Sequence, residues 1–164
     1  MALGTSLYDD ILTALEFGSK EQFGIDMQTA VDSYIDPADY GNGAVLVSSS
    51  TTAINYELDK NGTAKVASEK IAAEVESYFS NASVSPGTPQ NGGVKVLSPV
   101  ITYSSVYSTT QPALETEFLD KGSKEDAATG IETAISDGVL TVTCTWSEQL
   151  SDGSTIGPFS GVIS

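Results

Sequence analysis

The stretch KEDAATGIETAISDGVLTVTCTW, residues 124–146, changes its hydrophobic period partway along. Ala128, Ile131 and Ile135 recur every three to four residues, which places them on one face of an α-helix. Asp137-Gly138 is a typical stop signal for that helix. Beyond the stop, apolar residues alternate with threonines, which is the pattern of a half-buried β-strand. A helix that leads straight into a strand predicts a mixed α and β fold.

The predicted strand continues into a C-terminal hairpin. Its inward-facing residues are Leu140, Val142, Cys144 and Trp146, with threonines between them. Ser151-Asp-Gly-Ser154 supplies turn residues, after which the chain returns antiparallel with Ile156, Phe159 and Val162. Because Pro158 has no amide hydrogen to give to a neighbour, we expect this last strand to lie at an edge of the sheet.

Other patterns predict the remaining elements. Apolar stripes predict helices at about 7–15, 25–35 and 63–79, and the clearest stripe contains Ala67, Ile71, Val75 and Phe79. Runs rich in β-branched and aromatic residues predict strands at 44–47, 53–58, 94–97 and 100–107. Residues 113–119 follow Pro112 and suit either a strand or a helix.

Taken together, these elements predict an α+β fold, in which an antiparallel β-sheet is covered by three to four amphipathic helices and ends in a C-terminal β-hairpin. We expect a single domain over residues 1–164, because domains commonly contain about 100–150 residues. Residues 85–93, SPGTPQNGG, are rich in residues that break helices and strands, and they are the candidate place for a subdivision.

The charge balance excludes several classes of function. Seven Lys, no Arg and no His stand against 22 acidic residues, which gives a formal net charge of −15. Nucleic acids and anionic membranes are bound mainly through clustered Lys and Arg, so we expect neither as a partner. Without histidine the chain cannot form a Ser-His-Asp triad, and it lacks the imidazole ligands of most catalytic zinc sites.

Two stretches contain residues whose chemistry suits a nucleophile or a cation site, but their sequence patterns match such sites only loosely. Cys144 alternates with apolar residues, which favours a buried strand position over a nucleophile. Asp36, Asp39 and Asn42 bring three oxygen ligands into one turn and could hold Ca²⁺, yet the glycine and terminal glutamate positions of a calcium loop do not match. Acidic turns are common, so a solvated turn is the simpler interpretation.

Paired carboxylates, the machinery of glycoside hydrolases, are the remaining catalytic candidate. Glu57, Glu115, Glu117 and Glu148 fall on or near predicted strands. Glutamates on the polar face of strands are, however, ordinary in an acidic protein. The sequence contains no Gly-rich phosphate loop and no nucleophile-elbow motif. We therefore expect no enzymatic activity, no catalytic residue, no metal and no cofactor.

Three features resemble small acidic virion structural proteins of tailed bacteriophages. They are the opening Met1-Ala-Leu3, the Ala-rich helix at 64–80 that leads into Ser and Val strand residues, and the close Gly157-Pro-Phe-Ser-Gly-Val-Ile-Ser164. The resemblance implies a non-enzymatic subunit that assembles in many copies, as a capsid decoration, neck or tail component. It implies homo-oligomers, other virion structural proteins as partners, and a location in the virion after synthesis in the host cytoplasm. Residues 1–10 lack the positive start and apolar run of a signal peptide, so we expect no secretion by that route.

The alternative is an acidic binding module that recognises a basic protein or a sugar through a Tyr-containing surface. Salt discriminates between the two, because screening weakens electrostatic recognition more than subunit packing. For an assembly subunit we expect residues 151–164 and the exposed strands to contact neighbouring subunits, since an edge strand is a ready docking surface. The carboxylates of so negative a subunit should stay toward solvent.

Overall fold

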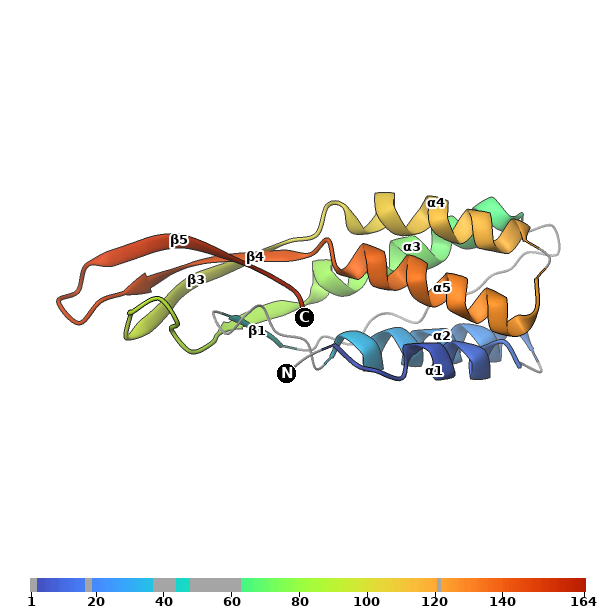
Figure 1. The fold of residues 1–164 in the computed structure, drawn as a ribbon, viewed down its shortest axis with the longest axis horizontal. Helices are drawn as coiled ribbons and strands as arrows, with labels where there is room; N and C mark the ends of the chain where they lie inside the picture. Colours follow the sequence, from blue (N-terminus) through green and yellow to red (C-terminus); the bar gives the residue numbers. More distant parts are fainter. Residues whose placement is uncertain (1–2, 17–18, 37–43, 48–62, 121) are drawn as a thin grey trace.

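A computed structural model describes residues 3–16, 19–36, 44–47, 63–120 and 122–164 (Figure 1). The described elements are, in chain order, α1 (Leu7–Ala14), α2 (Lys20–Ile35), β1 (Ala44–Val47), α3 (Ala64–Asn81), β2 (Ser83–Pro86), β3 (Lys95–Thr102), α4 (Val106–Leu119), α5 (Lys124–Val139), β4 (Thr143–Gln149) and β5 (Thr155–Val162). The predicted α+β class and the C-terminal hairpin are confirmed. The strand expected at 53–58 lies outside the described residues.

The helices and the main sheet occupy opposite ends of an elongated molecule (Figure 1). The helices pack on one another, α3 against α4, α4 against α5, and α1 against both α2 and α5. The expectation that helices would cover the sheet is therefore corrected: the sheet projects from the helical end. The physical reason is that the apolar stripes of the helices pack against one another and not against the sheet. The segment around β2 packs beside β3. Among the described helices, none combines the length and the apolarity needed to cross a bilayer.

The predicted apolar stripes form the core of the helical end. Ala67, Ile71, Val75 and Phe79 of α3 are all buried, as expected. Burial of each large apolar side chain contributes about 1.5–3 kcal/mol. The helix expected at 25–35 begins earlier, at Lys20, because the Ser19 hydroxyl accepts a hydrogen bond from the Gln22 amide at 3.2 Å and caps the first turn.

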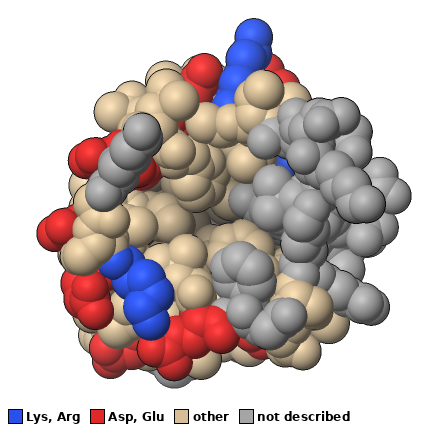
Figure 2. Space-filling view, turned by 90° about the vertical axis from the view of Figure 1, so that its right-hand side faces the viewer, with Lys and Arg blue, Asp and Glu red and all other residues tan. Residues whose placement is uncertain are grey.

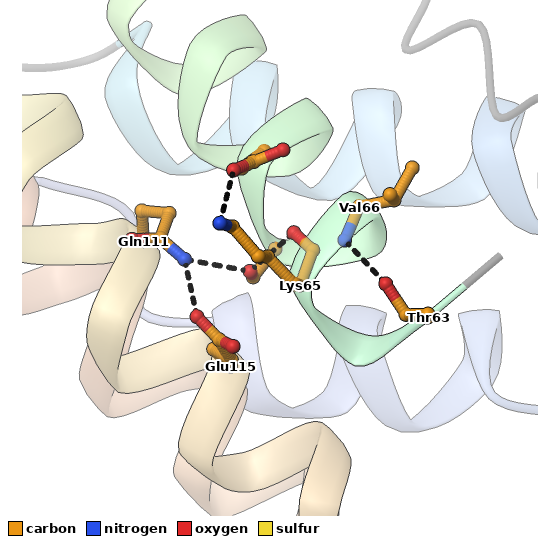
Figure 3. A network of polar contacts seen from close by, with 7 residues as sticks. Thr63, Lys65, Val66, Gln111 and Glu115 are labelled. Atoms are coloured by element: carbon orange, nitrogen blue, oxygen red, sulfur yellow. Dashed lines mark hydrogen bonds and ion pairs between the residues drawn. The ribbon is translucent and has the colours of Figure 1, made fainter.

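A polar network ties α4 to α3 (Figure 3). The side-chain amide of Gln111 donates to the Ser68 hydroxyl at 3.0 Å and to the Glu115 carboxylate at 2.8 Å. The Ser68 hydroxyl in turn donates to the Lys65 carbonyl at 2.8 Å, so this buried serine is satisfied. At the start of α4, the Glu76 carboxylate of α3 accepts the Tyr107 amide at 3.0 Å. A carboxylate there also complements the helix dipole.

The strand predicted at 100–107 is only partly correct. Extended structure ends at Thr102, and α4 begins at Val106 and continues through Pro112. Val106, Thr110 and Leu114 lie four residues apart and are all buried, so packing on α3 and α5 outweighs both the β-branched composition and the proline. Residues 113–119, whose sequence suited either a strand or a helix, are helical.

The predicted stop at Asp137-Gly138 is wrong, because α5 continues to Val139. Gly138 is the point where α5 meets α4: a Cβ on Gly138 would overlap the Thr110 hydroxyl. This glycine allows a close helix contact and does not end the helix. Leu140 follows the helix and is 45% exposed, whereas Val142, Cys144 and Trp146 are buried as predicted.

The main sheet is antiparallel, with strand order β3-β4-β5. The two strands expected at 94–97 and 100–107 are one strand, β3, whose pairing with β4 shifts between Leu97 and Val100. Ser98, at this irregularity, has a φ of 45°. A separate two-stranded sheet pairs β1 with β2, so the segment expected to be a loop from residue 85 begins as a strand.

Candidate functional site

The projecting sheet has two unlike faces. Trp146, Cys144 and Val96 point to a buried face, where the Trp146 ring lies 6.4 Å from that of Phe159, centroid to centroid. The opposite face carries Thr145 and is lined by hydroxyl and valine side chains. Because side chains alternate along a strand, β4 builds both faces from one short sequence.

Glu148 lies on the buried face of β4 and is completely inaccessible to solvent. Its Oε2 accepts backbone amides of Asn91 and Gly93, both at 3.0 Å. Its Oε1 accepts the Gln90 amide at 3.0 Å and the Asn91 side-chain amide at 2.9 Å. The Trp146 indole nitrogen lies 3.4 Å from the same oxygen. The carboxylate is thus enclosed by the turn at residues 90–93.

The hydrogen bonds decide the charge of Glu148. Burial by itself raises the pKa of this carboxyl, but the donors on Gln90, Asn91 and Gly93 stabilise the ionised form and lower the pKa to about 2. A carboxylate that stays ionised and has both oxygens engaged is suited to anchoring, not to proton transfer. Glu148 therefore fastens the turn at residues 90–93 to the sheet.

Charge is distributed unevenly between the sheet and the helices. Residues 94–104 and 141–164 contain only Lys95, Glu148 and Asp152 as charged side chains, and the Glu148 carboxylate is buried in its turn. Most of the 22 acidic residues lie on the helices. The space-filling view of the helical end shows Asp and Glu side chains, with Lys side chains among them, along the top, left and lower rim of a hollowed, uncharged centre (Figure 2). The sheet is consequently an almost neutral surface on a strongly negative chain.

The outer face of the sheet exposes apolar side chains. Val100 on β3 is 58% exposed and Val162 on β5 is 56% exposed. The pairing places Val100 beside Thr145 and, beyond it, Ser160. Exposed valines among hydroxyls, with little charge, are a composition suited to protein contact.

The edge formed by β5 is open in the part of the chain that the structure describes, where no strand pairs with its outer side. The Ile163 amide donates inward to the Val142 carbonyl at 3.1 Å, and the same register continues through Val162 and Ser160. Backbone groups alternate in direction along an antiparallel strand, so those of Ser160 and Val162 point away from β4. Both residues are exposed. Pro158 lies on this edge strand, as predicted.

A second surface feature is a groove of about 540 Å³ between α4 and α5. Three carboxylates line it, those of Glu117, Asp126 and Asp137, together with threonine side chains. Asp126 is already engaged, because it caps the start of α5 by accepting the Ser123 amide at 3.1 Å. The groove is acidic and would suit a basic group.

The structure separates the carboxylates that the sequence suggested as a pair. Glu115 and Glu117 lie on α4 and not on a strand, and the C-terminal half of α4 and the sheet carrying Glu148 lie toward opposite ends of the molecule (Figure 1). Glu148 is buried rather than on a polar face, which corrects that expectation as well. Glu57 lies outside the described residues.

The structure also bears on the possible calcium ligands and on the single cysteine. Asp36 is the exposed C-terminal cap of α2, whereas Asp39 and Asn42 lie outside the described residues. No group of three or more acidic or cysteine side chains is arranged for a metal within the described ranges. Cys144 is buried, and burial raises the pKa of its thiol, which disfavours the reactive thiolate.

Sequence reasoning missed the enclosure of Glu148, although one signal for it was present. Glu148 continues the alternation of Cys144 and Trp146 and therefore belongs to the inward-facing set. A carboxylate at an inward position needs several donors, and the Gln-Asn-Gly-Gly run at 90–93 supplies backbone amides.

Comparisons with known proteins leave the geometry as the basis for function. No protein-family model matches the chain, and no curated protein and no solved structure matches it either.

Proposed function

We propose that this chain is a non-enzymatic structural subunit of a tailed-bacteriophage virion, a capsid decoration, neck or tail component that contacts neighbouring subunits through the β3–β5 sheet. The observation that carries the proposal is the almost neutral sheet on a chain with a net charge of −15. Copies of so acidic a protein repel one another unless the contact surface carries little charge. The resemblance of the chain's two ends and α3 to phage virion proteins supports a phage virion as the particle.

The experiment is a mass measurement of native complexes that contain the chain, at about 0.1 M and about 1 M salt, where the Debye length falls from roughly 10 Å to 3 Å. An assembly subunit is expected in a large particle of many copies that persists at the higher salt. A chain that is monomeric, or that leaves its complex as salt rises, contradicts the proposal.

Paired variants test which surface makes the contact. Replacing both Val100 and Val162 by Lys should abolish incorporation into particles, because both side chains lie on the outer face of the sheet. Leu119→Lys is the matched control, since Leu119 is 67% exposed but lies on α4. Equal incorporation of the control and the double variant would contradict a sheet-mediated contact.

The acidic binding module is the second candidate function, and the groove between α4 and α5 favours it. Glu117 and Asp137 lie in that groove, and a basic peptide segment would be the matching ligand. This function predicts that Glu117→Gln with Asp137→Asn weakens partner binding and that about 1 M salt does the same. The assembly function predicts no effect of either.

A further inference from the structure

The two edges of the β3–β5 sheet differ in their accessibility. β2 lies close to β3, although these two strands are not paired, and within the described part of the chain no strand pairs with the outer side of β5. Ser160 and Val162 present their backbone groups on that outer side, and both are exposed. An exposed edge of this kind is a template for one further strand.

We propose that β5 pairs antiparallel with β5 of a second copy of this chain, so that two sheets join edge to edge. This inference rests on the proposed function, and it names the first contact made by the assembly subunit. Antiparallel pairing of identical strands follows a twofold axis, so each copy offers the same surface and the same backbone donors and acceptors. The outward amides and carbonyls of Ser160 and Val162 become paired with those of the second copy.

Charge favours a second copy as the occupant of this edge. From Thr155 to Ser164 the chain has no charged side chain, so two copies of this segment meet without like-charge repulsion. A partner recognised electrostatically would instead be a basic protein bound to the acidic helices. Val162, which is 56% exposed, also loses water contact when a second strand lies beside it.

The local sequence limits how much of β5 can pair regularly with the second copy. Pro158 has no amide hydrogen, and the β4–β5 register shifts nearby, between Trp146 and Glu148, so regular pairing is confined to the part of β5 beyond Pro158. A twofold contact uses up the β5 edge of both copies. Because a twofold contact between identical strands is self-complementary, it closes at two copies and favours a dimer over a fibre.

The test measures the mass of the purified full chain against concentration by analytical ultracentrifugation. Ser160→Pro removes an outward amide hydrogen, and Val162→Lys places a charge at the junction; each should weaken dimerisation about tenfold or more. Leu119→Lys is the matched control, because Leu119 is 67% exposed but lies on α4, away from the β5 edge, and it should dimerise like the unaltered chain. Far-UV circular dichroism and the melting temperature verify that each variant folds.

A monomeric unaltered chain at all concentrations, or equal dimerisation of all variants, overturns the self-pairing. Self-pairing also fails if Leu119→Lys disrupts the dimer as strongly as Val162→Lys. These outcomes are separate from failure of the proposed function, which would show as a chain found outside any large particle. A chain that is monomeric when purified yet present in a particle overturns only the self-pairing.

Discussion

The helical end buries side chains of five helices against one another, whereas the β3–β5 sheet buries one face and leaves the other to water. Ile71, Ile131 and Leu114 on the helices are almost entirely inaccessible to solvent, but Val100 and Val162 on the sheet are more than half exposed. The charges are distributed the other way, since most carboxylates lie on the helices. The part with the most buried apolar surface thus carries the repulsive charge, and the part with little charge remains free for contact.

The largest effect on stability is expected from the helical core. Ile71→Ala should lower the free energy of unfolding by about 2–5 kcal/mol, because Ile71 is fully buried and the vacated space is only partly refilled. Urea denaturation measures the change. Leu119→Ala, at an exposed position, should change it by less than about 0.5 kcal/mol. Equal losses for the two variants would remove the distinction between core and surface.

The contact between α4 and α5 should be sensitive to a single methyl group. Gly138→Ala should cost about 1–3 kcal/mol, because the new Cβ would overlap the Thr110 hydroxyl. Adding Thr110→Ala should restore much of this loss, since the Thr110 hydroxyl is buried and has no hydrogen-bond partner among the described residues. Thermal unfolding of both single variants and the double variant provides the measurement, and additive losses would contradict the proposed overlap.

In the sheet, Glu148→Gln should lower the melting temperature by less than Ile71→Ala does. The substitution replaces one acceptor oxygen with a donor that faces backbone amides. Hydrogen exchange at residues 90–93 should become faster, because the turn loses its anchor. Glu125→Gln, at an exposed helix position, serves as the control. Unchanged exchange in the turn would show that Glu148 does not hold it.

The same variant gives a pH dependence of defined sign. The pKa of Glu148 lies at about 2 in the folded chain, below its ordinary 4.5, so its stabilisation is complete above pH 4.5 and is lost as the pH falls toward 2. The difference in melting temperature between the unaltered chain and Glu148→Gln should shrink over that range. A difference that is constant from pH 6 to pH 2 would contradict this assignment.

The smallest effect is expected on the charged surface of the helices. The Lys124 ammonium lies 2.9 Å from the Glu16 carboxylate, but both side chains are at least half exposed. Water and salt screen such a pair, so Lys124→Ala should leave the melting temperature unchanged within error. A clear loss would mean that the charged surface of the helices also contributes to stability.

Local patterns predicted most of the secondary structure and little of the site. The stripe of Ala67, Ile71, Val75 and Phe79 identified α3, because amphipathic period is a property of neighbouring residues. The same reasoning failed for α4, whose β-branched residues and Pro112 favour other structures when read alone. Packing of Val106 and Leu114 decides the helix there, and sequence patterns do not report packing partners.

The sequence by itself determined the amphipathic helices, the alternating strand at Cys144 and Trp146, and the net charge, because each depends only on residue type and spacing. Only the tertiary structure decided that Glu148 is enclosed by the turn at residues 90–93, that Gly138 meets Thr110, and that the least charged strands project from the helices. Those features join segments far apart along the chain, and their geometry exists only once the helices and the sheet have packed.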